Sequence, residues 1–165
     1  MQIAKSFGAD VTAVTSSGNI DIVRSIGADQ VIDYTHEDFT KSGQRYDLIF
    51  DCYAKHPLSA CMRVLNPRGI YVGVGPPATA GWMGILTRLI QMLAYSLLTS
   101  KLLTFLAKPS KDDLIILREL MATGKVTPVI DRCYRLSEVP EAIRYLERGH
   151  SRGKVVITVE SSYPV

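Results

Sequence analysis

Short runs of β-branched and apolar residues alternate with helical segments through the first half of this 165-residue chain. These runs are Val11–Thr15, Val31–Ile32, Asp47–Cys52 and Ile70–Val74, and a turn is predicted at Asn66–Gly69 just before the last of them. Strands this short and apolar are typical of a parallel sheet covered on both faces, because parallel strands need helical crossovers. The sequence therefore predicts an α/β fold with a parallel sheet and helices on both of its faces.

Longer helices occupy the second half of the chain. The apolar stretch Trp82–Ala107 has a helical period and predicts one helix. Two further helices are predicted from Ser110 to Gly124 and from Ser137 to Gly149, each with a serine as its N-cap and a glycine at its end. The remaining β-branched runs, Val126–Ile130 and Lys154–Val159, predict two more strands.

Charge and hydropathy exclude two classes of partner. Lys and Arg number 19 against 16 Asp and Glu, so the net charge is only +3. These charges are interspersed, without the basic cluster that nucleic-acid binding requires, so no nucleic-acid partner is predicted. Arg88 and Lys101 divide the apolar stretch, and the uncharged part between them is shorter than the roughly 20 residues of a membrane span. The sequence predicts no membrane partner.

The cysteines indicate a reducing compartment. Cys52, Cys61 and Cys133 are odd in number, and none of them has the C-x-x-C spacing of a zinc or redox site. The three histidines are scattered, without the spacing of a helical metal site. The sequence therefore predicts structural cysteines, no metal ligands and a cytoplasmic location.

Small polar residues follow the first predicted strand. Ser16, Ser17 and Asn19 come directly after Val11–Thr15, at the N-terminus of the next predicted helix. Ligands of open parallel sheets bind beyond the carboxyl ends of the strands, and hydroxyl groups without a neighbouring acid suit a phosphate better than a ribose hydroxyl. Such residues also cap helices in many proteins. On spacing alone, a helix cap and a phosphate site are both open.

Four other residues stand close to predicted strand ends. Tyr34 follows the second strand, and Gly75 follows the fourth, where a glycine permits close approach of the backbone to a ligand. His150 and Arg152 belong to a basic turn after the last helix. Packing, turn formation and solvation explain these residues locally. They are candidate binding residues only in combination.

The segments together resemble the coenzyme-binding half of the medium-chain dehydrogenase/reductase superfamily, and within it the zinc-free quinone oxidoreductase (zeta-crystallin-like) branch. The resemblance follows the family order along nearly the whole chain. It is carried by Gln2–Ala9, Ser25–Asp29, Val31–Tyr34, Tyr46–Asp51, Leu65–Gly69, Gly124–Ile130 and Gly149–Val156. It implies a Rossmann-like sheet with NADPH as the coenzyme.

The family pattern also implies a role for each candidate binding residue. Ser16 would contact the adenosine 2′-phosphate, with Ser17 and Asn19 nearby and Tyr34 against the same ribose-phosphate. At the other end of the coenzyme, Gly75 would line the nicotinamide. The turn from His150 to Arg152 would close over the coenzyme.

In the family, the helix that contains Gln2–Lys5 is preceded by the first strand and by a glycine-rich turn that holds the pyrophosphate. We therefore expect this chain to be truncated at its N-terminus, with Met1 internal or a misread start. The strand order 3-2-1-4-5-6 would place the missing first strand inside the sheet. Residues 1–125 would form an incomplete coenzyme-binding domain, and residues 126–165 would belong to the catalytic lobe.

The function implied by the resemblance is hydride transfer from NADPH to a small molecule, namely a quinone, a carbonyl or an activated alkene, by a homodimer. No catalytic residue is predicted, and this chain alone is expected to be inactive. Two alternatives are open. Tyr46–Asp51 and Leu58–Gly69 also resemble a methyltransferase that uses a methionine-derived methyl donor. The second alternative is a non-catalytic remnant that dimerises through Trp82–Ala107.

Overall fold

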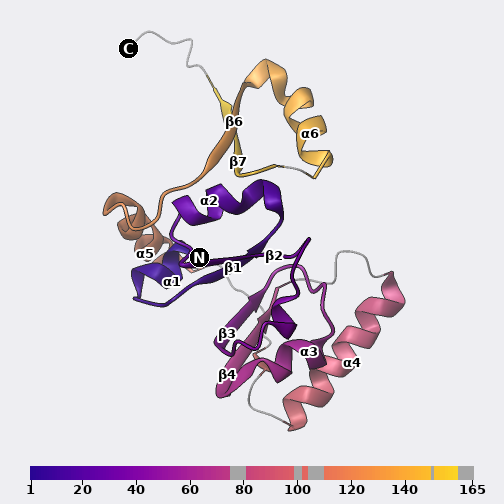
Figure 1. The fold of residues 1–165 in the computed structure, drawn as a ribbon. Helices are drawn as coiled ribbons and strands as arrows, with labels where there is room; N and C mark the ends of the chain where they lie inside the picture. Colours follow the sequence, from indigo (N-terminus) through magenta and orange to yellow (C-terminus); the bar gives the residue numbers. More distant parts are fainter. Residues whose placement is uncertain (75–80, 99–101, 104–109, 150, 160–165) are drawn as a thin grey trace. The chain divides into compact units, whose positions relative to one another are not determined.

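The computed structural model describes residues 1–74, 81–98, 102–103, 110–149 and 151–159. They fall into two compact units: residues 1–35 with the chain from 110 onward, and residues 36–109. Every strand pairing among these described residues is parallel, as the sequence predicted (Figure 1). The strands form three sheets, β1–β2, β3–β4–β5 and β6–β7. The domain boundary predicted between residues 125 and 126 stays a prediction.

The first unit begins with helix α1 (Gln2–Ser6), strand β1 (Thr12–Thr15), helix α2 (Ile20–Ser25) and strand β2 (Gln30–Asp33). Figure 1 shows α2 lying along the β1–β2 pair as its crossover. The pairing runs from Thr12↔Gln30 to Thr15↔Asp33, so both strands end at the same edge of the sheet. Residues that follow β1 and β2 therefore lie close together.

Helix α5 (Lys111–Ala122) and helix α6 (Val139–Glu147) differ in how they begin. Ser110 caps α5 as predicted, because its Oγ accepts hydrogen bonds from the backbone N–H groups of the second and third helical residues, at 3.2 and 3.5 Å. The cap predicted at Ser137 is wrong. A 3₁₀ turn precedes α6, and the Glu138 carboxylate accepts a 2.8 Å bond from the N–H of Arg135.

Strands β6 (Ile130–Arg135) and β7 (Lys154–Thr158) form the third sheet. The strand predicted at Val126–Ile130 is wrong, because β6 begins where that segment ends. The physical reason is the side chain of Gln2, which bonds to both backbone groups of Thr127: Nε2 donates to the carbonyl at 2.8 Å, and Oε1 accepts from the N–H at 2.5 Å. Because both backbone groups of Thr127 are bonded to Gln2, they do not pair with a neighbouring strand.

The second unit contains strands β3 (Tyr46–Asp51), β4 (Leu65–Gly73) and β5 (Leu102–Leu103). The β3–β4 pairing jumps from Tyr46↔Leu65 to Leu48↔Ile70, which leaves the predicted turn at residues 66–69 outside the regular register. Gly69 is required there, because a Cβ would come within 2.8 Å of the Tyr46 carbonyl oxygen.

Helices α3 (Leu58–Arg63) and α4 (Trp82–Leu98) complete the second unit. The core of this unit packs α3 against β3 and β4, and its buried members are Ile49, Leu58, Cys61, Val64, Leu65 and Tyr71. The single helix predicted through Ala107 is wrong, because β5 pairs with β4 inside that range. No helix among the described residues is both long and apolar enough to cross a membrane.

Candidate functional site

The turn between β1 and α2 carries the first three predicted binding residues. Ser16 precedes a 3₁₀ turn, Ser17–Asn19, and neither Ser16 nor Asn19 forms a side-chain capping bond. Both side chains are half-buried, and within the described part of the chain neither has a hydrogen-bond partner. The helix-cap interpretation is therefore not supported here. The hydroxyl of Ser16 and the amide of Asn19 are available to a ligand.

Ser17 has a different role from its two neighbours. Its Oγ donates a 2.5 Å hydrogen bond to Oδ2 of Asp33, the last residue of β2. The other carboxylate oxygen of Asp33 accepts from the N–H of Thr35 at 2.9 Å and from its hydroxyl at 2.6 Å. Because the single hydroxyl proton of Ser17 goes to Asp33, Ser17 fixes the turn and cannot donate to a ligand at the same time.

Asp33 is the residue of this site that sequence reasoning missed. The sequence has no acid directly after the first strand, but the parallel register places the end of β2 beside the end of β1. A search for acids at the end of the neighbouring strand would have found it. Its carboxylate is occupied by Ser17 and Thr35, which reduces its availability to a ribose hydroxyl.

Tyr34 lies at the same edge of the sheet. Its N–H donates a 2.9 Å bond to the carbonyl of Thr15, the residue before Ser16, and the side chain is 43% exposed. The structure thus brings Tyr34 next to the turn, as predicted from the strand ends. Gly75 and His150 lie outside the described residues.

Arg152 reaches the turn from the far end of the sequence. Its Nη2 lies 3.6 Å from the position that a Cβ would take on Gly18. No ion pair joins its guanidinium to another side chain among the described residues. The site therefore combines a cation with the hydroxyl of Ser16 and the amide of Asn19, a donor set that suits a phosphate group.

The turn that carries Arg152 is tightly packed. The Ser151 hydroxyl donates a 2.6 Å bond to the Gly153 carbonyl, and the N–H of Lys154 donates to the Val129 carbonyl at 2.7 Å. A Cβ on Gly153 would come within 2.5 Å of the Val129 oxygen. Glycine is thus the residue that fits between Arg152 and β7.

Comparison with known proteins identifies the family. Residues 26–157 match the protein family described as zinc-binding dehydrogenase. The chain belongs to the medium-chain dehydrogenase/reductase superfamily. Within it, the similarities place the chain in the zinc-free quinone oxidoreductase branch. In the described part of the chain, no group of three His, Cys, Asp or Glu side chains is arranged to hold a metal ion.

Two relatives and one solved structure illustrate the membership. The chain is 34% identical over 161 residues to the chloroplastic quinone-oxidoreductase QR1 of Triphysaria versicolor, covering 95% of this chain and 47% of that protein. It is 33% identical over 179 residues to the mitochondrial NAD(P)H oxidoreductase RTN4IP1 of Mus musculus, covering 96% and 44%. The quinone oxidoreductase structure from Coxiella burnetii superimposes with a TM-score of 0.75 at 27% identity, covering 96% and 48%.

The chain spans about half the length of the relatives that it matches. Its family membership argues against the methyltransferase alternative, because the matching proteins are named as oxidoreductases. The relatives also support a nicotinamide coenzyme for the family. The dimer and the cytoplasmic location stay predictions.

Proposed function

We propose that this chain binds the adenosine end of NADPH in an oxidoreductase that transfers hydride to a quinone, a carbonyl or an activated alkene. The bound nicotinamide supplies the hydride, and the described residues of this chain bind and orient the coenzyme. Family membership supports the class of reaction. The choice of NADPH rests on the geometry of the turn between β1 and α2.

One observation carries the proposal: the Arg152 guanidinium lies beside Gly18, in the turn where the side chains of Ser16 and Asn19 have no hydrogen-bond partner among the described residues. A 2′-phosphate presents several acceptor oxygens and a double negative charge, whereas a ribose 2′-hydroxyl needs one acceptor. A guanidinium and two neutral donors match the phosphate, because bonds between charged partners are about twice as strong as neutral ones.

Asp33 is the competing feature of this site. A carboxylate near the turn repels a phosphate and can accept a bond from a ribose hydroxyl, which would favour NADH. Here both of its oxygens accept bonds from Ser17 and Thr35. We infer that Asp33 orients Ser17 and the turn, while Arg152 sets the preference for the phosphate.

The test uses 2′,5′-ADP and 5′-AMP, which differ only in the 2′-phosphate and engage only the adenosine end of the site. Isothermal titration calorimetry on the 165-residue chain measures both dissociation constants at fixed ionic strength. We expect 2′,5′-ADP to bind at least about tenfold more tightly, which is the low end for hydrogen bonds to a charged group. Equal affinities would contradict the choice of NADPH, because the site would then not recognise the 2′-phosphate. Binding of neither nucleotide would contradict the whole proposal and favour a remnant fold without coenzyme.

Arg152→Ala and Arg118→Ala form a matched pair of variants in this assay. Both remove one exposed cation from the first unit, but Arg118 lies on α5 and has no contact with the turn among the described interactions. We expect Arg152→Ala to abolish most of the preference for 2′,5′-ADP and Arg118→Ala to retain it. If both variants lower the preference equally, a general charge effect and not a phosphate contact is responsible.

A further inference from the structure

A carboxylate holds the backbone of the residue that the proposed function depends on. Asp131, the second residue of β6, accepts a 3.1 Å hydrogen bond at Oδ2 from the N–H of Arg152. The same oxygen accepts a 2.6 Å bond from the hydroxyl of Tyr145 on α6. One carboxylate oxygen therefore joins a strand, a helix and the turn that precedes β7.

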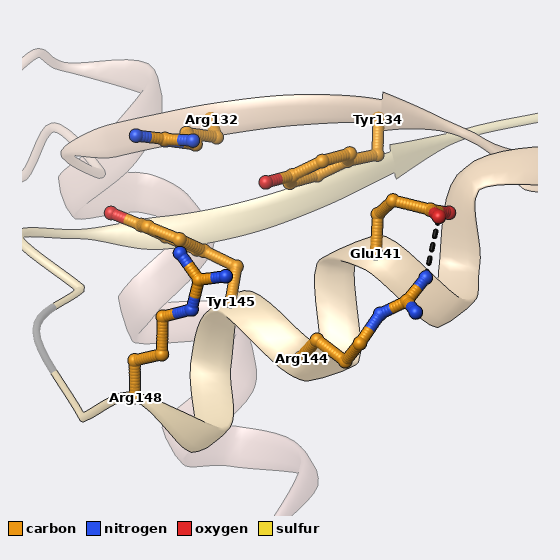
Figure 2. A pocket seen from close by; sticks show the side chains of 6 residues that line it. All are labelled: Arg132, Tyr134, Glu141, Arg144, Tyr145 and Arg148. Carbon is orange, nitrogen blue, oxygen red and sulfur yellow. Dashed lines mark hydrogen bonds and ion pairs between the residues drawn. The ribbon is translucent and has the colours of Figure 1, made fainter.

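Tyr145 is itself oriented by a cation. The guanidinium carbon of Arg132 lies 4.1 Å from the centroid of the Tyr145 ring, and Figure 2 shows the Arg132 side chain on one face of that ring. A guanidinium over an aromatic face is attracted by the ring electrons. This contact restricts the ring to a position from which its hydroxyl reaches Asp131.

The protonation states suit this arrangement. The bond from the Tyr145 hydroxyl, followed by the one from the Arg152 backbone, holds the pKa of Asp131 below its ordinary value. The same bond to Asp131 raises the pKa of Tyr145. At neutral pH the carboxylate is therefore ionised and the phenol is protonated, so Asp131 accepts both hydrogen bonds.

We propose that Asp131 and Tyr145 are positioning residues that hold the Arg152 turn over Gly18 and thereby set the preference of this site for a 2′-phosphate. The proposal rests on the proposed function, which assigns the phosphate to this turn. Among the described residues, no hydrogen bond or ion pair joins either residue to the Ser16–Asn19 turn, so we infer that both act through Arg152.

The other anchors of the turn do not replace this pair. The Ser151 hydroxyl binds the Gly153 carbonyl, and Gly153 itself packs on Val129. These contacts fix the side of the turn that leads into β7. The N–H of Arg152 is instead bonded to Asp131. Without that bond, the backbone from which the guanidinium extends is no longer held in place. Fixing a binding group in advance strengthens binding, because less conformational freedom is lost when the ligand arrives.

The test measures the dissociation constants of the Tyr145→Phe and Asp131→Asn variants for the same two nucleotides, 2′,5′-ADP and 5′-AMP, by calorimetry. For Tyr145→Phe we expect the affinity for 2′,5′-ADP to fall about fivefold, as for the loss of one hydrogen bond, and the affinity for 5′-AMP to stay within about twofold. Asp131→Asn, which leaves an uncharged acceptor in place, is expected to change the affinities in the same direction. Thermal unfolding of each variant shows that it is folded before it is titrated.

Tyr71→Phe is the matched control. It removes a 2.7 Å bond from a tyrosine hydroxyl to the carboxylate of Asp51, the same chemistry in the other unit, and we expect both affinities to be unchanged. Two results would overturn the inference while leaving the proposed function intact. The first is a Tyr145→Phe protein that keeps the wild-type preference, with Arg152→Ala still abolishing it. The second is an equal loss of affinity for both nucleotides, which a merely structural role would produce. If Tyr145→Phe does not fold, Asp131→Asn decides by the same criteria.

The wild-type titration separates failure of this inference from failure of the proposed function. A wild-type chain that does not prefer 2′,5′-ADP refutes the function, and the positioning role falls with it. A wild-type chain with the expected preference leaves the variants of Tyr145 and Asp131 as the test of positioning alone.

Discussion

Replacing Gly153 by alanine tests the turn that carries Arg152. A Cβ at this position would lie 2.5 Å from the carbonyl oxygen of Val129 and 3.0 Å from both its carbonyl carbon and its Cγ1. Contacts are ordinary only from 3.4 Å, so the Val129 oxygen has to move by about 0.9 Å. That oxygen also accepts the 2.7 Å bond from the N–H of Lys154, which such a movement breaks or lengthens.

The expected cost follows from these two effects. Overpacking of a closely fitted site costs about 1–3 kcal/mol. Loss of one backbone hydrogen bond adds about 1 kcal/mol. We therefore expect Gly153→Ala to lower the free energy of unfolding by about 2–4 kcal/mol, a large fraction of the stability of an ordinary domain.

Urea unfolding followed by circular dichroism measures this loss, and hydrogen exchange localises it. Amides of β6 and β7 are expected to exchange faster in the variant. The control is Gly81→Ala, where a Cβ meets no atom of the described residues within 4 Å and the backbone needs no positive φ. Its stability should stay within about 0.5 kcal/mol of wild type. A Gly153→Ala protein as stable as Gly81→Ala, with unchanged exchange in β6 and β7, would refute the described packing of the turn.

Four further perturbations have expected outcomes. Gln2→Ala removes both bonds to the Thr127 backbone and is expected to lower the free energy of unfolding by about 1–2 kcal/mol in urea titrations. An unchanged midpoint would show that these two bonds do not stabilise the protein. Ser110→Ala removes the cap of α5 and should cost about 1 kcal/mol, with Ser110→Asp restoring it. Asp33→Asn removes a negative charge beside Ser17 and is expected to increase the preference for 2′,5′-ADP over 5′-AMP by calorimetry, while a decrease would show that Asp33 acts on this preference by orienting the turn and not through its charge. Bonds from Lys5 and then from the N–H of Val11 lower the pKa of Asp29 from 3.8. Asp29→Asn should therefore destabilise the protein above pH 3.8, and this effect should disappear as the pH falls below that value. A destabilisation that persists in acid would contradict a stabilising role of the ionised Asp29 carboxylate.

Local signals in the sequence predicted the elements well where neighbouring residues decide them. Ser110 caps α5 because its partners lie two and three residues away, within the same turn. Gly124 follows the end of α5, as predicted, with a φ of +70°, which glycine adopts without strain. The parallel pairing of β1 with β2 followed from their short apolar runs and the helix between them.

Long-range contacts explain where prediction failed. Nothing near Val126 indicates that the Thr127 backbone is bonded to Gln2, which lies 125 residues away in the sequence. The pairing of β5 with β4 likewise depends on a strand that lies about 30 residues earlier in the sequence. Hydrophobic period alone does not distinguish this from one continuous apolar helix.

In the candidate site, too, residues marked by local signals were predicted and residues that depend on long-range contacts were missed. Ser16, Asn19 and Tyr34 were predicted as binding residues because they follow strand ends. Arg152 was predicted from a basic turn in combination with the family resemblance. Asp33 was missed because its contact with Ser17 depends on the register of two strands. The contact of Tyr145 with Asp131 joins a helix to a strand 14 residues earlier, without any sequence motif to mark it.

Amide chemical-shift mapping of the isotopically labelled chain with 2′,5′-ADP shows directly whether the 2′-phosphate binds at the end of β1. We expect saturable shifts that are largest for residues 16–19, Tyr34 and Arg152, and that are much smaller with 5′-AMP. The groove between β6 and α6, lined by Arg132, Arg144 and Arg148, is a second cationic surface that would attract the nucleotide (Figure 2). Shifts confined to that groove, or no saturable shifts at residues 16–19, would contradict a phosphate site at the end of β1.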